Sequence, residues 1–359
     1  MKSKRTTPLS QRGINTLAQS GKPENKKTPI CLMGKGSEMT NTATLKKNAN
    51  KKFITQKTAL GLVDASKNKS GASEMKKKYW NSWHCLRKVY TSNGLKYGKY
   101  CKNRSCTVCS GIRKAEIINR YYPVLQQWPD PHFVTLTSKS VSKRGLAKRM
   151  KDVFRAFTII TTKHRKKRNN GLPGTLKGIK SLECNFNPKA HTYNVHLHII
   201  VPDKSTADVL KTEWLALWTK NGTWDKVLAT PKAQNVKKVW DKEGALVELI
   251  KYSSKIFTDP DVMNKTNTLV NKTVYMAALH NIYQAMKNLR IFERFGFNLP
   301  KQESKEPIAI NQTTDYDLWY YHHKALDWVN RETGEVLTGY TPDYNLVELF
   351  EKRTDTELE

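Results

Sequence analysis

Apolar and polar residues alternate along several short runs in the middle of the chain, and this two-residue period is typical of half-buried β-strands. The first run is HFVTLT at 132–137, and two more occupy 178–186 and 193–201. The segment NPKAHT between those two contains the Asn, Pro and small polar residues of a hairpin connection. A fourth strand is predicted at 233–240, so the alternation indicates a sheet of at least four strands.

Apolar residues spaced three and four positions apart predict helices between and after these strands. A basic loop containing Gly and Pro, residues 163–174, is expected to end the first helix. The expected helices begin near Ser142, at a cap formed by Ser205 or Thr206, near residue 243 and near residue 272. The order β-α-β-β-α-β-α predicts an α+β fold in which helices flank a central antiparallel β-sheet.

The run YNVHLHIIV places two histidines on one face of its strand. Because side chains alternate along a strand, His196 and His198 point to one side and the apolar residues between them point to the other. An isolated His-x-His of this kind is more often a solvated polar face. Glu183 in the preceding strand changes the interpretation, because pairing it with His198 across the hairpin brings a carboxylate beside both imidazoles.

A donor set of two imidazoles and one carboxylate suits Mg²⁺ or Mn²⁺ and leaves positions for water or a phosphate oxygen. We therefore predict that His196 and His198 bind a divalent metal, with Glu183 as the candidate third ligand.

The helix predicted at 243–257 carries a second set of reactive side chains. Its buried stripe leaves Glu248, Tyr252 and Lys255 together on the opposite side, at spacings of four and three residues. A surface tyrosine between a glutamate and a lysine is the ordinary interpretation. Close to a metal-binding strand, however, a tyrosine hydroxyl is a competent nucleophile toward a phosphodiester.

Four of the six cysteines fall close together, as Cys85-x15-Cys101-x4-Cys106-x2-Cys109. The Cys-x-x-Cys spacing lets one turn supply two ligands to a tetrahedral Zn²⁺, so a structural zinc site is predicted, with free thiols as the alternative. His84 is a substitute for Cys85 in this site. Neighbouring basic residues, including Arg104 and Arg113, are expected to contact phosphates.

The balance of charge identifies the class of partner. The chain has 63 Lys and Arg against 31 Asp and Glu, a formal charge of +32, which favours a polyanion and above all nucleic acid. No run of eighteen apolar residues is present, and the sequence MKSKRTTPLSQRG lacks the apolar run of a secretory signal. We expect a cytoplasmic protein without a membrane partner.

Composition divides the chain into four segments. They are a basic, mostly disordered arm at 1–79, a cysteine-rich zinc module at 80–125, a catalytic domain at 126–300 and an acidic tail at 301–359.

Three motifs resemble, in the same order, those of the HUH endonucleases, and within them the rolling-circle replication initiator (Rep) proteins of small bacterial plasmids. FVTLTSKSV resembles the first motif, VHLHII the histidine motif, and ELIKYSSKIF the tyrosine motif. The segment RIFERFGFNLP and the cysteine-rich segment are also similar to parts of plasmid Rep proteins. The resemblance covers about residues 85–300.

This resemblance implies a site- and strand-specific DNA nickase and strand transferase that works at a plasmid double-strand origin. Tyr252 would be the nucleophile that becomes joined to the 5′ phosphate, with Lys255 assisting at the phosphate or metal and Glu248 activating water to end the cycle. The implied partners are origin DNA, single-stranded or cruciform at the nick, and the host helicase and replication machinery. The alternatives are an HUH-type transposase or relaxase, and a non-catalytic zinc-containing DNA-binding regulator.

Overall fold

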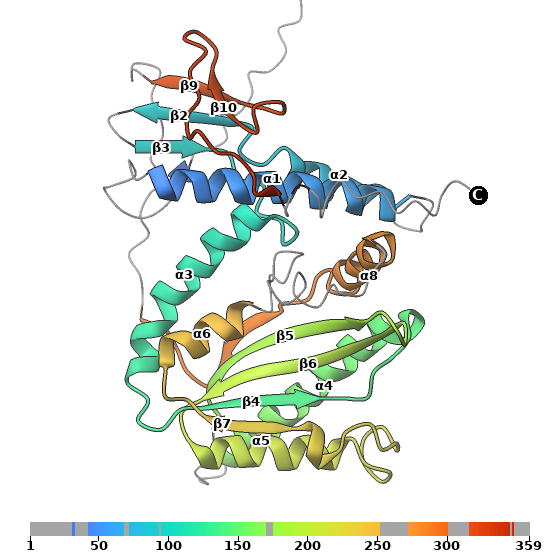
Figure 1. Cartoon of the computed structure of the whole chain (residues 1–359). Coiled ribbons are helices and arrows are strands. Elements are labelled where there is room, and N and C mark those ends of the chain that lie inside the picture. Colours follow the sequence, from blue (N-terminus) through green and yellow to red (C-terminus); the bar gives the residue numbers. More distant parts are fainter. Residues whose placement is uncertain are drawn as a thin grey trace, which may run out of the picture.

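The computed structural model describes most of the chain and shows two antiparallel sheets joined by a long helix (Figure 1). The described residues are 31–32, 42–67, 72–92, 95–169, 175–251, 272–300, 316–344 and 347. Helix α3 (Thr107–Gln126) runs from one sheet to the other (Figure 1).

The larger sheet has five strands, all antiparallel to their neighbours. Its two central hairpin strands, β5 and β6, are the 178–186 and 193–201 runs of the sequence, and β4 and β7 are the other two predicted strands. The order across the sheet is β7 (Asn235–Lys238), β4 (His132–Thr137), β6 (Thr192–Val201), β5 (Gly178–Asn187) and β8 (Phe292–Phe295). The predicted α+β fold with a central antiparallel sheet is therefore confirmed.

Helices cover the two faces of this sheet unequally. The apolar face, which includes Val134 and Leu197, packs on α4 (Lys143–Asn169), α5 (Lys204–Leu217) and α8 (Lys272–Ala285) to form the largest core. On the opposite face, α3 and α6 (Lys242–Lys251) pack over one end of the sheet, where Ile179 and Ile200 meet Leu246 and Leu249. The remainder of that face carries the histidines.

The smaller sheet brings together the two ends of the described chain. Its strands, in order, are β1 (Cys31–Leu32), β3 (Leu95–Gly98), β2 (Lys88–Ser92), β9 (Asp317–His322) and β10 (Asp327–Asn330). A core that contains Trp319, Tyr321 and Trp328 joins this sheet to α1 (Thr42–Ala65) through Ala49. The segment 301–359, predicted as an acidic tail, therefore supplies two strands, β9 and β10, to this sheet.

The prediction of a mostly disordered arm up to residue 79 is wrong for the residues described there. Helix α1 and helix α2 (Ala72–Trp83) bury Phe53, Leu62 and Tyr79 against Met276 of α8. Because α1 contacts α2, α3 and α8 on different sides, its apolar residues are spread around the helix. They form no single stripe, which is why the sequence pattern did not reveal a helix.

Two helix boundaries differ from those predicted. Helix α5 is capped by Asp203, whose carboxylate accepts a hydrogen bond from the Thr206 N–H at 2.7 Å, so neither Ser205 nor Thr206 is its cap. Helix α4 continues to Asn169, through the first part of the segment that was expected to be a loop. Within the described part of the chain, no helix combines the length and hydropathy that crossing a membrane requires.

Candidate metal centres

The histidine face is assembled by three adjacent strands of the larger sheet. On β6, His196 stands opposite Thr137 of β4 and Glu183 of β5, while His198 stands opposite Thr135 and Ser181. The predicted register, with Glu183 opposite His198, is therefore wrong by two residues. An even shift keeps every side chain on the same face, so the carboxylate still lies beside the imidazoles.

The turn between β5 and β6 fixes the observed register. Asn187 Oδ1 accepts hydrogen bonds from the N–H groups of Lys189 and Ala190, at 3.0 and 3.1 Å. His191 then adopts a φ of 49°, in the left-handed region. Such turn geometry sets which residues pair, and the strand pattern alone does not contain it.

The three predicted ligands meet in one place. Glu183 Oε2 lies 2.8 Å from His196 Nε2 and 2.6 Å from His198 Nε2. The two imidazole rings are edge to face, with centroids 4.8 Å apart. All three residues are buried, and Glu183 is only 2% exposed. The structure thus brings His196, His198 and Glu183 together as a group able to bind a metal ion.

The neighbours of the histidines fix how the rings present their nitrogens. His196 Nδ1 lies 3.0 Å from Asn194 Oδ1, and Thr137 Oγ1 also donates a hydrogen bond to that oxygen at 3.0 Å. Because an amide oxygen only accepts, the His196 proton sits on Nδ1. In the neutral ring, Nε2 then directs a lone pair toward the Glu183 carboxylate. Two electron-rich groups at this separation favour a cation between or beside them.

The charge state of Glu183 agrees with this arrangement. Burial alone raises the pKa of a carboxyl group, but when both His196 and His198 also carry a proton on Nε2, their hydrogen bonds to Glu183 outweigh burial and lower its pKa to about 2. The carboxylate is therefore ionised at neutral pH. Together with two imidazoles it provides the N/O donors that Mg²⁺ and Mn²⁺ accept.

Helix α6 leads from the covered end of this sheet face toward the tyrosine motif. Its buried residues pack on Ile179 and Ile200, which belong to the histidine face. Glu248 lies on α6, whereas Tyr252 and Lys255 lie outside the described residues. The structure thus places Glu248 on a helix that packs on the same face as the histidines.

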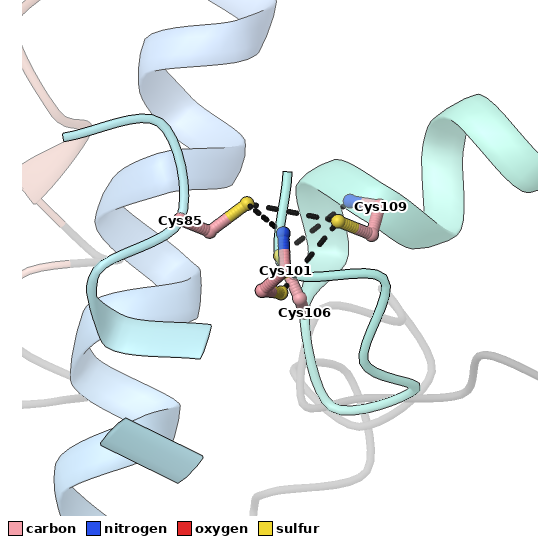
Figure 2. Close-up of side chains that lie close together, drawn as sticks. All are labelled: Cys85, Cys101, Cys106 and Cys109. Atoms are coloured by element: carbon pink, nitrogen blue, oxygen red, sulfur yellow. Dashed lines mark hydrogen bonds between the residues drawn. The ribbon is translucent and has the colours of Figure 1, made fainter. Parts of the chain in front are cut away.

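The second group of metal-binding side chains consists of the four predicted cysteines, drawn in Figure 2. Cys109 Sγ lies 3.6 Å from both Cys85 Sγ and Cys101 Sγ, too far for a disulfide and close to the ~3.8 Å edge of a regular tetrahedron with ~2.3 Å Zn–S bonds. Cys85 joins this group, and the adjacent His84 instead packs edge-on against Trp83.

Backbone N–H groups point at the sulfur atoms of this cluster. The amides of Cys101, Lys102, Asn103 and Cys109 donate to cysteine sulfurs at 3.3–3.5 Å. Hydrogen bonds from Cys106 and Cys109 lower the pKa of the Cys101 thiol. Donors of this kind stabilise thiolates, which are the form that binds a metal.

A buried lysine lies beside the cysteines. Lys52 of α1 is 1% exposed, and its Nζ donates to the carbonyl oxygens of Trp83 and Cys85 at 2.7 and 2.5 Å. Burial lowers the pKa of Lys52 to about 8, and the nearby Cys85 and Cys106 oppose that shift. No carboxylate among the described residues forms an ion pair with it. The cysteine cluster is therefore the group beside Lys52 that could carry a compensating negative charge.

The cysteine loop also contacts the larger domain. Arg104, between Cys101 and Cys106, donates to the carbonyl oxygens of Met286 and Leu289 just beyond α8. Arg113 donates to the carbonyl oxygen of Lys102. Arg104 therefore binds protein carbonyls in this structure, and phosphate contacts by the basic residues of this loop stay a prediction.

Sequence reasoning did not assign Asn194, Thr135, Thr137 or Lys52 to these centres. The sequence did contain a signal for Asn194, Thr135 and Thr137. These residues alternate with apolar residues on the histidine strand and on the strand beside it, so they share the face of the histidines. Thr135 Oγ1 lies 3.2 Å from His198 Nδ1, as Asn194 Oδ1 lies beside His196. Nothing in the sequence around Lys52 indicated its proximity to cysteines more than thirty residues away.

Comparison with known proteins identifies the family. A family model described as "Replication protein" matches residues 92–327, which include the Glu183, His196 and His198 group and every member of the cysteine group except Cys85. The chain belongs to this replication protein family. A curated relative, "Protein rep" of Staphylococcus aureus, is 29% identical over 195 residues, or 51% of this chain and 77% of the relative. The resemblance to plasmid Rep initiators is thereby confirmed, and a Rep protein is expected to bind DNA. No solved structure matches the chain.

Proposed function

We propose that this Rep protein is an HUH-type nickase that cuts and rejoins one DNA strand at a plasmid double-strand origin to start rolling-circle replication. The observation that carries this proposal is the convergence of His196 Nε2, His198 Nε2 and Glu183 Oε2 on the sheet face over which α6 packs. A helix that packs there and directly precedes Tyr252 in the sequence supports the delivery of a nucleophile to a phosphate beside the metal group.

The antiparallel sheet supports the HUH assignment. The histidine strand β6 is central, and its neighbours β4 and β5 supply the first motif and the carboxylate. In the proposed fold, the first motif has a defined task, because Thr135 and Thr137 contact His198 and the Asn194 partner of His196. The motif order of the sequence thus corresponds to neighbouring strands in space.

The proposed reaction is a transesterification at phosphorus. The Tyr252 hydroxyl oxygen forms a bond to the phosphorus atom, the bond from phosphorus to the 3′ oxygen breaks, and the 3′ oxygen leaves with a proton as a hydroxyl group. Lys255 would stabilise the charge on the phosphate, and Glu248 would take a proton from the water that later releases the protein. A divalent cation held by His196, His198 and Glu183 would withdraw charge from the phosphate oxygens.

We further propose that Cys85, Cys101, Cys106 and Cys109 hold a structural Zn²⁺. The sulfur separations, the four N–H donors and the buried Lys52 all suit a tetrathiolate ion. Because the cysteines connect α3, the loop before β2 and the Arg104 contact to α8, the ion would stabilise the junction between the two sheets.

A nicking assay tests the proposed chemistry. Full-length protein is mixed with single-stranded DNA from the origin of its own replicon and Mn²⁺ or Mg²⁺, and the covalent adduct is measured on a denaturing gel. Tyr252→Phe is expected to abolish the adduct while leaving DNA affinity within about twofold. Tyr344→Phe, at an exposed residue that belongs to neither metal-binding group, is the matched control.

An adduct that persists in Tyr252→Phe would show that another residue is the nucleophile. A protein that binds origin DNA and shows no metal-dependent cleavage would instead fit the non-catalytic, zinc-containing regulator. Cleavage at the ends of a mobile element rather than at an origin would indicate a transposase or relaxase. The host helicase and replication machinery remain the predicted protein partners.

A further inference from the structure

One face of the smaller sheet is rich in aromatic and apolar side chains and is directed away from the protein core. The strand register places Lys88, Tyr320 and Val329 in one row across β2, β9 and β10, and it places Tyr90 and Leu318 in the next. Val336 extends the first row through a bridge to Val329. We call these six residues the tyrosine face.

The other side of the same strands is buried. Val89, Trp319, Tyr321 and Trp328 alternate with the tyrosine face and pack into the core that includes Ala49 of α1. The alternation of β9, DLWYYH, therefore separates a core side from a side available to a partner.

Basic groups accompany the rings of the tyrosine face. Lys88 Nζ lies 5.0 Å from the centroid of the Tyr320 ring, and the Arg331 guanidinium lies 5.7 Å from it. Tyr316, 44% exposed, packs edge to face on Tyr90 with centroids 5.2 Å apart. The rings are thus held in place beside exposed cations.

The carboxylates of the two strands are turned away or engaged. Asp317 pairs with Thr91, on the other side of the sheet, and accepts a hydrogen bond from its hydroxyl. Asp327 is buried and accepts from the N–H and hydroxyl groups of Thr338. Positive charge from Lys88 and Arg331 consequently accompanies the half-buried rings without a carboxylate from β9 or β10 to neutralise it.

We propose that the tyrosine face binds single-stranded DNA by stacking unpaired bases on Tyr320 and Tyr90. Half-buried aromatic rings on a sheet, flanked by exposed cations, suit this ligand because each base has a flat face and each nucleotide has a phosphate for Lys88 or Arg331. Paired bases present only their edges in the grooves, so a duplex does not offer those faces. The proposal rests on membership of a DNA-replication family and not on the nicking chemistry.

The test is the affinity of the full-length Tyr252→Phe protein, which avoids the proposed covalent step, for a fluorescent single-stranded oligonucleotide, measured by anisotropy without added Mg²⁺ or Mn²⁺. Tyr320→Leu keeps an apolar side chain but removes the ring, and is expected to raise Kd about 5- to 100-fold. Tyr320→Phe is expected to bind within about twofold of the parent. The association constant falls as the salt concentration rises, and Arg331→Gln should make the negative slope of its logarithm against log salt concentration shallower by about 0.7.

Tyr344→Leu is the matched control, because Tyr344 is 76% exposed and lies outside the sheet. Should Tyr320→Leu misfold by circular dichroism, Tyr90→Leu replaces it in the same series. The proposal is overturned if the Leu and Phe variants bind alike, or if duplex binding falls while single-strand binding does not.

The two proposals can fail separately. Normal cleavage by a Tyr320→Leu protein whose single-strand affinity equals that of the parent would overturn only the tyrosine face. If single-strand binding depends on the Tyr320 ring but the protein never forms a covalent adduct with DNA, only the nickase proposal is overturned.

Discussion

Asn194 Oδ1 lies 3.0 Å from His196 Nδ1 on the same strand, two residues away and on the same face. The amide therefore selects the ring proton position that leaves Nε2 to face Glu183. A residue in this position orients a metal ligand without being one.

We predict that Asn194→Ala lowers the affinity for Mn²⁺ about 10- to 100-fold, because His196 loses the acceptor that fixes its tautomer and orientation. Isothermal titration calorimetry with Mn²⁺ measures the change. Asn185→Ala is the control, since Asn185 is opposite Asn194 in the register but exposed. Equal losses in both variants would mean that Asn194 acts only through the stability of the hairpin.

Removing the zinc proposed for the cysteine centre is expected to lower the melting temperature, because four thiolates beside one another repel when no cation holds them. Zinc content and thermal unfolding are measured before and after treatment with a chelator. Cys106→Ser should behave like the treated protein, whereas Cys184→Ser, which lies outside the cluster, should retain the metal. A melting temperature that does not respond to the chelator would contradict a structural role.

Lys52→Met should release zinc to a chromogenic chelator faster than the parent protein. The methionine preserves much of the buried volume but removes the charge that faces the thiolates, and a loss of about tenfold in affinity corresponds to ~1.4 kcal/mol. Lys46→Met on the exposed side of α1 serves as the comparison. Unchanged release would indicate that the N–H donors alone balance the charge of the cluster.

The contact of Arg104 with the end of α8 should contribute to global stability. Arg104→Gln leaves carbonyl oxygens of Met286 and Leu289 with weaker donors, so we expect the free energy of unfolding to fall by about 1–3 kcal/mol. Urea denaturation followed by tryptophan fluorescence gives this value. Arg113→Gln, which removes one exposed contact to the Lys102 carbonyl, should cost less than about 0.5 kcal/mol.

A buried ion pair joins β5 to the edge strand β8. Lys180 Nζ lies 2.6 Å from Glu293 Oε1 and close to the rings of Phe154 and Phe157. Glu293→Gln leaves the lysine charge without its partner and is expected to cost ~2 kcal/mol, less than a fully enclosed pair because Glu293 is partly exposed. Adding Lys180→Met should recover most of that loss in a double-mutant cycle. Additive losses would mean that the two side chains do not depend on each other.

The parts of the structure that sequence could predict are those with local causes. Strand alternation was enough to place His196, His198 and Glu183 on one face, and the Cys-x-x-Cys spacing was enough to indicate the second centre. The register of the β5–β6 hairpin was mispredicted because the turn at His191 sets it. Tyr252 and Lys255 lie outside the described residues, so their place beside the histidines is still a prediction.

The parts that sequence could not predict depend on distant partners. Helix α1 is buried on several sides by α2, α3 and α8, and such a helix shows no single apolar stripe. Strand β9 pairs with β2 across more than two hundred residues; Thr91 and Asp317, for example, are 226 positions apart. No local pattern reports which of several edge strands a later strand will join.

The position of β9 between β2 and β10 has a practical consequence for work on this Rep protein. A fragment that stops near residue 300 would retain the histidine group and the tyrosine motif. It would lack β9, however, so β2 would have no partner strand on that side, and Val89 and Leu86 would lose the side chains that cover them. The N–H and C=O groups of β2 would then form an unprotected edge, a template for association between chains. Insolubility of such a truncated protein would therefore reflect the loss of this neighbouring strand and would not show that the larger sheet and its helices are unable to fold.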